Sequence, residues 1–166
     1  MMRTTTAGAG MTQLAVPDEA HMQRVARALA AGITAGDIVE LCGSMGAGKT
    51  TFTRYLAEAL GCSDVVRSPT YTVAHIYELA DGATLAHIDA WRHEGIIDAA
   101  EWGDLAPVLD ATIACIEWPD PLEPWLADRS RWRVELVHAG ADRRLVRIAA
   151  PSGRTCAAFI SALGGV

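Results

Sequence analysis

The chain has 166 residues, of which 51% are hydrophobic, and it carries a formal net charge of −6. This length suits one domain with a substantial core, and the apolar content excludes an intrinsically disordered protein. The acidic balance argues against a protein that grips nucleic acid by itself, because phosphate contacts need a basic surface.

No run of the sequence approaches the roughly 18 apolar residues of a membrane span. Residues 1–10 lack the apolar centre of a signal peptide. The four cysteines form no CxxC pair and no metal-ligand spacing, which favours reduced thiols. We therefore expect a cytoplasmic protein with no membrane partner.

The first part of the chain predicts a tail, a strand and a helix. Residues 1–10 read as a flexible N-terminal tail, and residues 12–16 favour a short edge strand. A helix should begin after Asp18, whose side chain is expected to cap it by accepting a bond from a free backbone N–H. The apolar face of this helix would carry Val25, Leu29 and Ile33.

Residues 37–60 are the most informative stretch, with a short apolar run, a glycine-rich loop and a helical segment. Gly43, Gly48, Lys49 and Thr50 fill the G-x-x-x-x-G-K-[ST] pattern of a phosphate-binding P-loop. In such a loop, Lys49 would reach the β- and γ-phosphates and the Thr50 hydroxyl would bind Mg²⁺. Lys49 is also the only lysine among the 14 Lys and Arg residues, as suits a site that needs a compact ammonium. The competing interpretation is a glycine turn that only caps a helix.

The rest of the chain predicts strands alternating with helices. We expect a hairpin of strands at 73–79 and 84–91, followed by a helix at 94–109 and a buried strand at 111–116. A second hairpin should follow at 132–137 and 145–148, and a closing helix at 154–163. Asp81 and Gly82 form a strong turn signal in the first hairpin, and the helix at 94–109 should stop near Pro107. This order indicates an α/β fold, with one P-loop NTPase-like domain over residues 11–166 and a mixed central sheet flanked by helices.

Two acidic residues follow predicted strands and are candidates to serve a magnesium ion. Glu117 and Asp89 each end an apolar run, and carboxylates in such positions beside a P-loop hold Mg²⁺ or orient the attacking water. Each is otherwise a solvated acid where a strand enters a loop. His87 would share a strand face with Asp89 and would either polarise a water or, the favoured interpretation, satisfy a buried carbonyl. Thr70 would either sense the γ-phosphate or form a local turn.

Four motifs carry a resemblance to a known family. They are GSMGAGKTT at 43–51, SPTYTV at 68–73, HIDAWR at 87–92 and IEWP at 116–119. In this order and spacing, the chain resembles the TsaE (YjeE) family of bacterial tRNA threonylcarbamoyladenosine synthesis. Many proteins share the P-loop, whereas the SPTYT and EWP motifs make the match specific.

The resemblance implies an ATPase that binds ATP with Mg²⁺ and hydrolyses it slowly alone. It implies work with TsaB and TsaD, which modify adenosine 37 of tRNA, so that tRNA would be met only through that complex. It also assigns the ATP loop to Gly46, Ala47, Gly48, Lys49, Thr50 and Thr51.

The same resemblance assigns further roles by position. Thr50 and Glu117 match the metal ligands, and Asp89 matches an acid needed for hydrolysis, which makes it a catalytic residue beside Lys49. Glu19 and Arg143 match positions near the base. Trp91 stands where the family usually has Tyr, and Ser44 where it commonly has Asp. The Trp91 substitution leaves open any role assigned to a tyrosine hydroxyl.

Three other functions remain open. A P-loop small-molecule kinase would need an acceptor pocket and a lid with convergent arginines, and no lid insertion is evident in the sequence. A GTPase would carry the N-K-x-D motif, which is absent. A nucleotide-sensing module without catalysis differs from the ATPase only in turnover.

Overall fold

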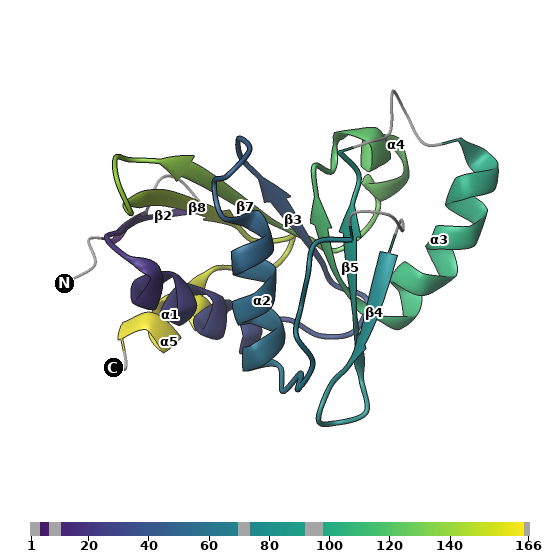
Figure 1. Cartoon of the computed structure of the whole chain (residues 1–166), viewed down its shortest axis with the longest axis horizontal. Helices are drawn as coiled ribbons and strands as arrows, with labels where there is room; N and C mark the ends of the chain where they lie inside the picture. The colour runs from purple at the N-terminus through teal and green to yellow at the C-terminus, as the bar shows by residue number, and fades with distance from the viewer. Residues whose placement is uncertain (1–3, 7–10, 70–73, 92–97, 165–166) are drawn as a thin grey trace.

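The computed structural model describes residues 4–6, 11–69, 74–91 and 98–164 of the chain (Figure 1). The strands are β1 (Thr4–Thr6), β2 (Met11–Val16), β3 (Ile38–Cys42), β4 (Ala74–Glu78), β5 (Thr84–Asp89), β6 (Ile113–Glu117), β7 (Arg131–His138) and β8 (Arg144–Ala149). The helices are α1 (Glu19–Ala30), α2 (Lys49–Ala59), α3 (Ala99–Ala111), the 3-10 turn η1 (Asp120–Leu122), α4 (Glu123–Leu126) and α5 (Ala157–Gly164).

The described strands form one mixed sheet in the order β1-β2-β8-β7-β3-β6-β5-β4. β7, β3, β6 and β5 are parallel to one another, and they form its centre. β4 is added antiparallel at one edge, and β8, β2 and β1 extend the other side as antiparallel neighbours. The carboxyl ends of β3, β6 and β5 therefore meet at the same edge of the sheet, where ligands bind in open α/β sheets.

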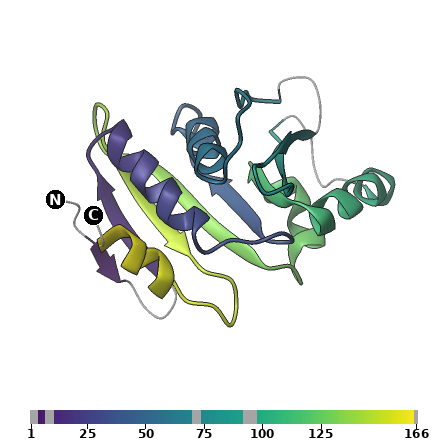
Figure 2. The same ribbon diagram turned by 90° about the horizontal axis from the view of Figure 1, so that it is seen from below.

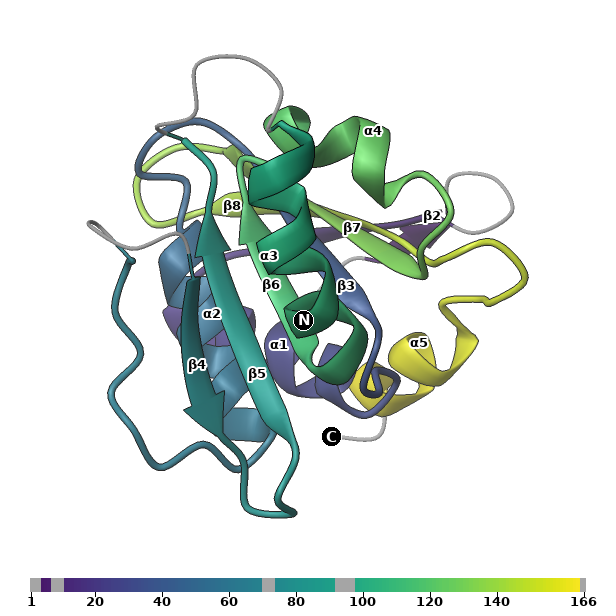
Figure 3. The same cartoon turned by 90° about the vertical axis from the view of Figure 1, so that its right-hand side faces the viewer.

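Helices cover both faces of the sheet. α1, α2 and α5 lie on one face, and α3 lies across β5 and β6 on the other (Figures 2 and 3). Successive residues of the central strands alternate between two separate cores, so that Leu85 belongs to the α1–α2 side and Ile88 to the α3 side. This burial on both faces explains the nearly continuous apolar runs of β3 and β6.

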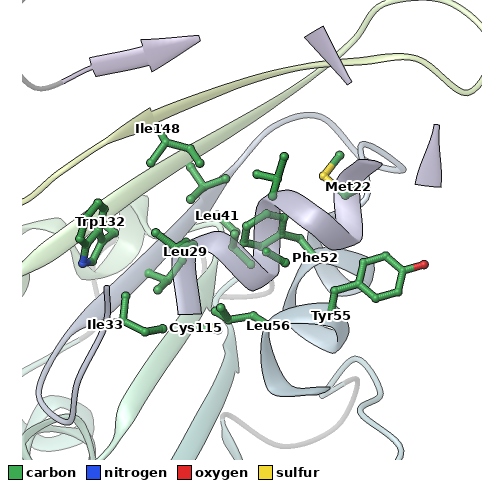
Figure 4. Close-up of a cluster of buried hydrophobic side chains, with 14 of the residues drawn as sticks. Met22, Leu29, Ile33, Leu41, Phe52, Tyr55, Leu56, Cys115, Trp132 and Ile148 are labelled. Atoms are coloured by element: carbon green, nitrogen blue, oxygen red, sulfur yellow. The ribbon is translucent and has the colours of Figure 1, made fainter. Parts of the chain in front are cut away.

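The larger core joins α1 and α2 to the sheet (Figure 4). Leu29 of α1 and Phe52 and Leu56 of α2 are fully buried, and they pack with Leu41 of β3 and Cys115 of β6. Because α2 begins at the phosphate loop, this packing fixes the loop relative to β3 and β6.

Most of the predicted elements are confirmed, including the α/β class, the mixed sheet and both hairpins. The Asp18 side chain caps α1, since it accepts a bond from the backbone N–H of His21 at 2.9 Å. The helix ends at Ala30, so that Ile33 reaches the core from the following turn instead of from the helix.

Two predictions about element boundaries are wrong. β2 is not an edge strand, because Thr4–Thr6 of the predicted tail pairs with it as β1. β-branched threonines suit a strand, and pairing satisfies the edge that β2 would otherwise expose. α3 also continues through Pro107 to Ala111. Leu105 and Leu109, on either side of that proline, are buried against the sheet, and this packing outweighs the missing helix hydrogen bond.

Candidate nucleotide site

The phosphate loop connects the central strand β3 to α2 and can be built only with glycine at key positions. Gly43 has φ 144°, and a Cβ there would lie 2.4 Å from the backbone oxygen of Leu136. Gly48, the N-cap of α2, has φ 106°, a left-handed conformation that disfavours side chains. It caps the helix without a side-chain hydrogen bond. The first N–H groups of α2 therefore face the loop, as in anion sites at helix N-termini.

Lys49 lies at the mouth of the loop and is 5% exposed. Its Nζ donates to the backbone oxygens of Gly43 at 2.8 Å and Ser44 at 2.9 Å. The same ammonium lies 3.7 Å from the centre of the Trp118 ring, a cation–π contact. Burial lowers the pKa of Lys49, against the opposing effect of the Glu117 and Asp89 carboxylates. The ammonium is thus held in place and directed along the loop.

Thr50 and Glu117 come together across 67 residues of sequence. The Thr50 hydroxyl donates to Oε1 of Glu117 at 2.7 Å, and Glu117 is 4% exposed. Nε2 of His87 lies 2.9 Å from the same oxygen. The partner of His87 is therefore a carboxylate, where the sequence favoured a backbone carbonyl.

Asp89 lies beside Glu117, because the parallel register of β5 and β6 pairs the two residues. Its carboxylate accepts bonds from the backbone N–H of Trp91 at 3.1 Å and from the Ser68 hydroxyl at 3.4 Å. The prediction that His87 and Asp89 share a strand face agrees with the structure, because the His87 ring contacts Glu117 and Asp89 lies beside the same residue.

The chemistry of these groups fits Mg²⁺. A hydroxyl and carboxylates are hard oxygen ligands, and Mg²⁺ is commonly held by one or two of them together with nucleotide phosphates. Among the described residues, no group of three or more His, Cys, Asp or Glu side chains could hold a metal ion alone. Thr50 and Glu117 are the neighbouring oxygen ligands that could hold such an ion together with nucleotide phosphates.

Two cavities flank the phosphate loop. The one on the Lys49 side, here the phosphate-side cavity, has a volume of about 330 Å³. It is lined by Met45, Gly46, Gly48, Lys49, Thr50, Thr51, Ser68, Asp89, Trp91, Glu117 and Trp118. The other, here the base-side cavity, has a volume of about 470 Å³ and lies between the loop, α1 and the β7–β8 turn. It is lined by Asp18, Glu19, Met22, Gly46, Ala47, Gly48, Thr51, Asp142 and Arg144.

The structure brings together nearly all the residues predicted to form the site. Glu19 lines the base-side cavity, and its carboxylate contacts the Tyr55 hydroxyl and Arg54. Arg143 is exposed and lies outside the lining of both cavities, whereas Arg144 lines the base-side cavity. The role of Arg143 near the base stays a prediction. Thr70 lies outside the described residues.

Sequence reasoning missed two features of the site. Arg144 donates from Nε to the backbone oxygen of Ala47 at 3.0 Å, which joins the β7–β8 turn to the loop. Trp118 has an unusual φ of 57° and packs on Trp91 with ring centres 4.3 Å apart. The EWP motif marked the position of Trp118, but no local signal indicated that its ring would contact Lys49.

Comparisons with known proteins assign the chain to a family. The family model described as "Threonylcarbamoyl adenosine biosynthesis protein TsaE" matches residues 16–146. A Streptomyces coelicolor protein named "tRNA threonylcarbamoyladenosine biosynthesis protein TsaE" is 39% identical over 148 residues, which cover 87% of this chain and 100% of the relative. A Bacillus subtilis protein of the same name is 36% identical over 132 residues, which cover 78% of this chain and 80% of the relative.

A solved structure has a similar fold. The structure titled "Crystal structure of Bacillus subtilus YdiB" is 26% identical and superposes with a TM-score of 0.74, covering 96% of this chain and 97% of its own. No helix of the described residues is long and apolar enough to cross a membrane. With its P-loop NTPase-like α/β fold, the chain belongs to the TsaE family of tRNA threonylcarbamoyladenosine biosynthesis proteins.

Proposed function

We propose that this protein binds ATP with Mg²⁺ at the phosphate loop and hydrolyses it slowly, as a cytoplasmic subunit that acts with TsaB and TsaD in t6A37 modification of tRNA. The observation that carries the proposal is the grouping of Lys49, Thr50 and Glu117 at the start of α2. Family membership supplies the pathway, and the P-loop pattern supplies the ligand.

Each residue of the site has a distinct role in this proposal. Lys49 would exchange its contacts with the Gly43 and Ser44 oxygens for contacts with phosphate oxygens. Thr50 and Glu117 would hold the Mg²⁺, which, when bound, neutralises charge on the phosphates. Asp89 lines the phosphate-side cavity and would orient the attacking water.

The base-side cavity is proposed to receive the adenosine part of the nucleotide. Glu19 lines it from α1, and Asp142 and Arg144 line it from the β7–β8 turn. Arg143, the residue that the resemblance places near the base, would have to turn inward when the nucleotide binds.

A small-molecule kinase is the alternative that the phosphate-side cavity could suggest. Such kinases stabilise the transferred phosphate with arginine or lysine clamps. Among the described residues that line this cavity, Lys49 is a cation but none is an arginine. Within the described lining, the positive charge available for phosphate transfer to a second substrate is therefore small, which supports hydrolysis over a kinase reaction.

Steady-state ATP hydrolysis by Lys49→Ala tests the proposal. Removing one charge that contacts the transition state should lower turnover by about 100-fold or more. Arg27→Ala is a matched control, because it removes a cation from the exposed side of α1 and should leave turnover unchanged. Near-normal turnover in folded Lys49→Ala protein would contradict the assignment of the phosphate loop.

A further inference from the structure

The buried imidazole of His87 is a polar group that the proposed function does not yet use. His87 lies in β5, is 0% exposed and faces Glu117 on the neighbouring strand. Its Nε2 is 2.9 Å from Oε1 of Glu117, whereas its Nδ1 has no hydrogen-bond partner among the described residues. A buried polar side chain with only one partner calls for a functional explanation.

The surroundings of the two ring nitrogens of His87 indicate which of them carries the hydrogen. An ionised carboxylate only accepts hydrogen bonds, so Nε2 must carry the hydrogen that lies between His87 and Glu117. A buried N–H without a partner is rarer than a buried acceptor without one, which makes Nδ1 the bare nitrogen. His87 therefore donates from Nε2 to Oε1 of Glu117.

Oε1 of Glu117 is consequently held from two elements. Thr50 donates to it from the first turn of α2 at 2.7 Å, and His87 donates to it from β5. Within the described residues, no donor contacts the second carboxylate oxygen of Glu117. Two donors on one oxygen fix the rotation of the carboxyl group about its last bond.

We propose that His87 is a positioning residue that sets the orientation of the Glu117 carboxylate for Mg²⁺. This inference rests on the proposed function, because it assigns His87 to the metal that Glu117 is proposed to bind. Groups that orient a metal ligand from behind typically change metal affinity by about 10- to 100-fold when removed. His87 would act only through Glu117 and would touch neither the nucleotide nor the metal.

The test measures how strongly Mg²⁺ assists nucleotide binding. The affinity for a non-hydrolysable ATP analogue is determined by calorimetry with Mg²⁺ and with a chelator, and the ratio of the two is the metal coupling. His87→Leu should reduce this coupling by about tenfold while leaving the affinity without metal unchanged. His87→Gln should restore most of it, since its amide can present an N–H near the position of Nε2.

His75 provides the matched control. It lies directly opposite His87 in the antiparallel pair of β4 and β5, and its ring packs against Tyr77. His75→Gln should therefore keep the coupling of the natural protein. As an independent readout, nitrogen-15 NMR of the His87 ring should show the Nε2–H tautomer.

Several results would overturn the inference. Full metal coupling in folded His87→Leu protein would contradict it alone and leave the proposed function standing. Loss of metal-free binding together with the coupling, without rescue by His87→Gln, would reduce His87 to a structural role. An Nδ1–H tautomer of His87 would also contradict the inference, because Nε2 would then have no hydrogen to donate to Glu117. Absence of any nucleotide binding by the natural protein would overturn both this inference and the proposed function.

Discussion

Lys49 and Glu117 are charged residues that are almost fully buried. Burying a charge is unfavourable unless polar partners replace water. Lys49 has two backbone oxygens and the face of Trp118, and Glu117 has the Thr50 hydroxyl and the His87 ring within hydrogen-bond distance. At this scale the site is prepared for a charged ligand, because its ionic groups are already oriented.

Removing Glu117 and removing Asp89 should have different effects on ATP binding and hydrolysis. Glu117→Ala is expected to weaken ATP binding about tenfold or more, but only when Mg²⁺ is present, because it removes a proposed metal ligand. Asp89→Ala should bind ATP normally and hydrolyse it poorly. Calorimetry together with steady-state turnover measures both effects, and the reverse pattern would exchange the two roles.

Asp37 makes a separate, structural ion pair that should govern acid stability. Burial by itself raises the pKa of this carboxyl, but hydrogen bonds from Arg154 and Ser130 outweigh burial and leave the pKa lowered. A lowered pKa adds stability above the unfolded value of about 3.9, and this contribution is lost as the pH falls further. Asp37→Asn should reduce the free energy of unfolding at pH 7 by about 1 to 2 kcal/mol, since the half-exposed Arg154 is partly screened by solvent, and flatten its dependence below about pH 4.

Urea denaturation between pH 3 and pH 7, values chosen to span roughly the acid transition, measures this effect. Asp110→Asn is the control, since Asp110 pairs with Arg129 at 2.6 Å but is 67% exposed. An exposed pair contributes less than about 1 kcal/mol. Equal losses in the two variants would show that burial of the Asp37 pair has no special effect.

At the scale of elements, the phosphate loop depends on the β7–β8 hairpin. The loop begins at Gly43 against the backbone oxygen of Leu136 in β7, and the Arg144 side chain at the start of β8 bonds to Ala47. The hairpin therefore contacts the loop both at its beginning and near its middle.

Gly43→Ala should disrupt this contact. The added Cβ would meet the Leu136 oxygen at 2.4 Å in a left-handed backbone conformation, and we expect a loss of about 2 to 4 kcal/mol in the free energy of unfolding. Gly140→Ala is the matched control, because Gly140 has φ 92° with no atom near its Cβ. It should lose only about 1 kcal/mol by denaturant titration. Similar losses in both variants would mean that strain, not the contact, decides the effect.

The local parts of this arrangement are predictable from sequence, and the long-range parts are not. The glycines, Lys49 and the strand–helix context of the loop are adjacent in the chain, so the pattern identifies them directly. The contact between Thr50 and Glu117 spans 67 residues, and its existence depends on the order of strands in the sheet. The partner of His87 depends on the same order.

Turn geometry explains the remaining differences. Arg143 and Arg144 are neighbours at the β7–β8 turn, and the phase of that turn decides which one faces the loop. No regular spacing in the sequence indicates which of the two arginine side chains faces the loop. Likewise, α3 continues through Pro107 because of packing against the sheet, which local propensity does not include.

At the scale of the whole molecule, the site lies at the edge where the central parallel strands end. The antiparallel strands β8, β2 and β1 extend the sheet beyond β7, and α3 covers the face opposite α1 and α2 (Figures 1 and 3). The net charge of −6 disfavours direct binding to tRNA, whose contacts would need a basic surface. We therefore expect contact with tRNA to come through TsaB and TsaD.

Sedimentation of the protein with TsaB and TsaD, in the presence of ATP and Mg²⁺, of ADP, or of neither, tests this account most directly. ATP with Mg²⁺ should give the strongest association, because we expect the assembled state to bind ATP with Mg²⁺ better than the free protein does, and such a difference in affinity shifts the equilibrium toward assembly. Lys49→Ala protein should lose this preference. Equal association under all three conditions would contradict the account.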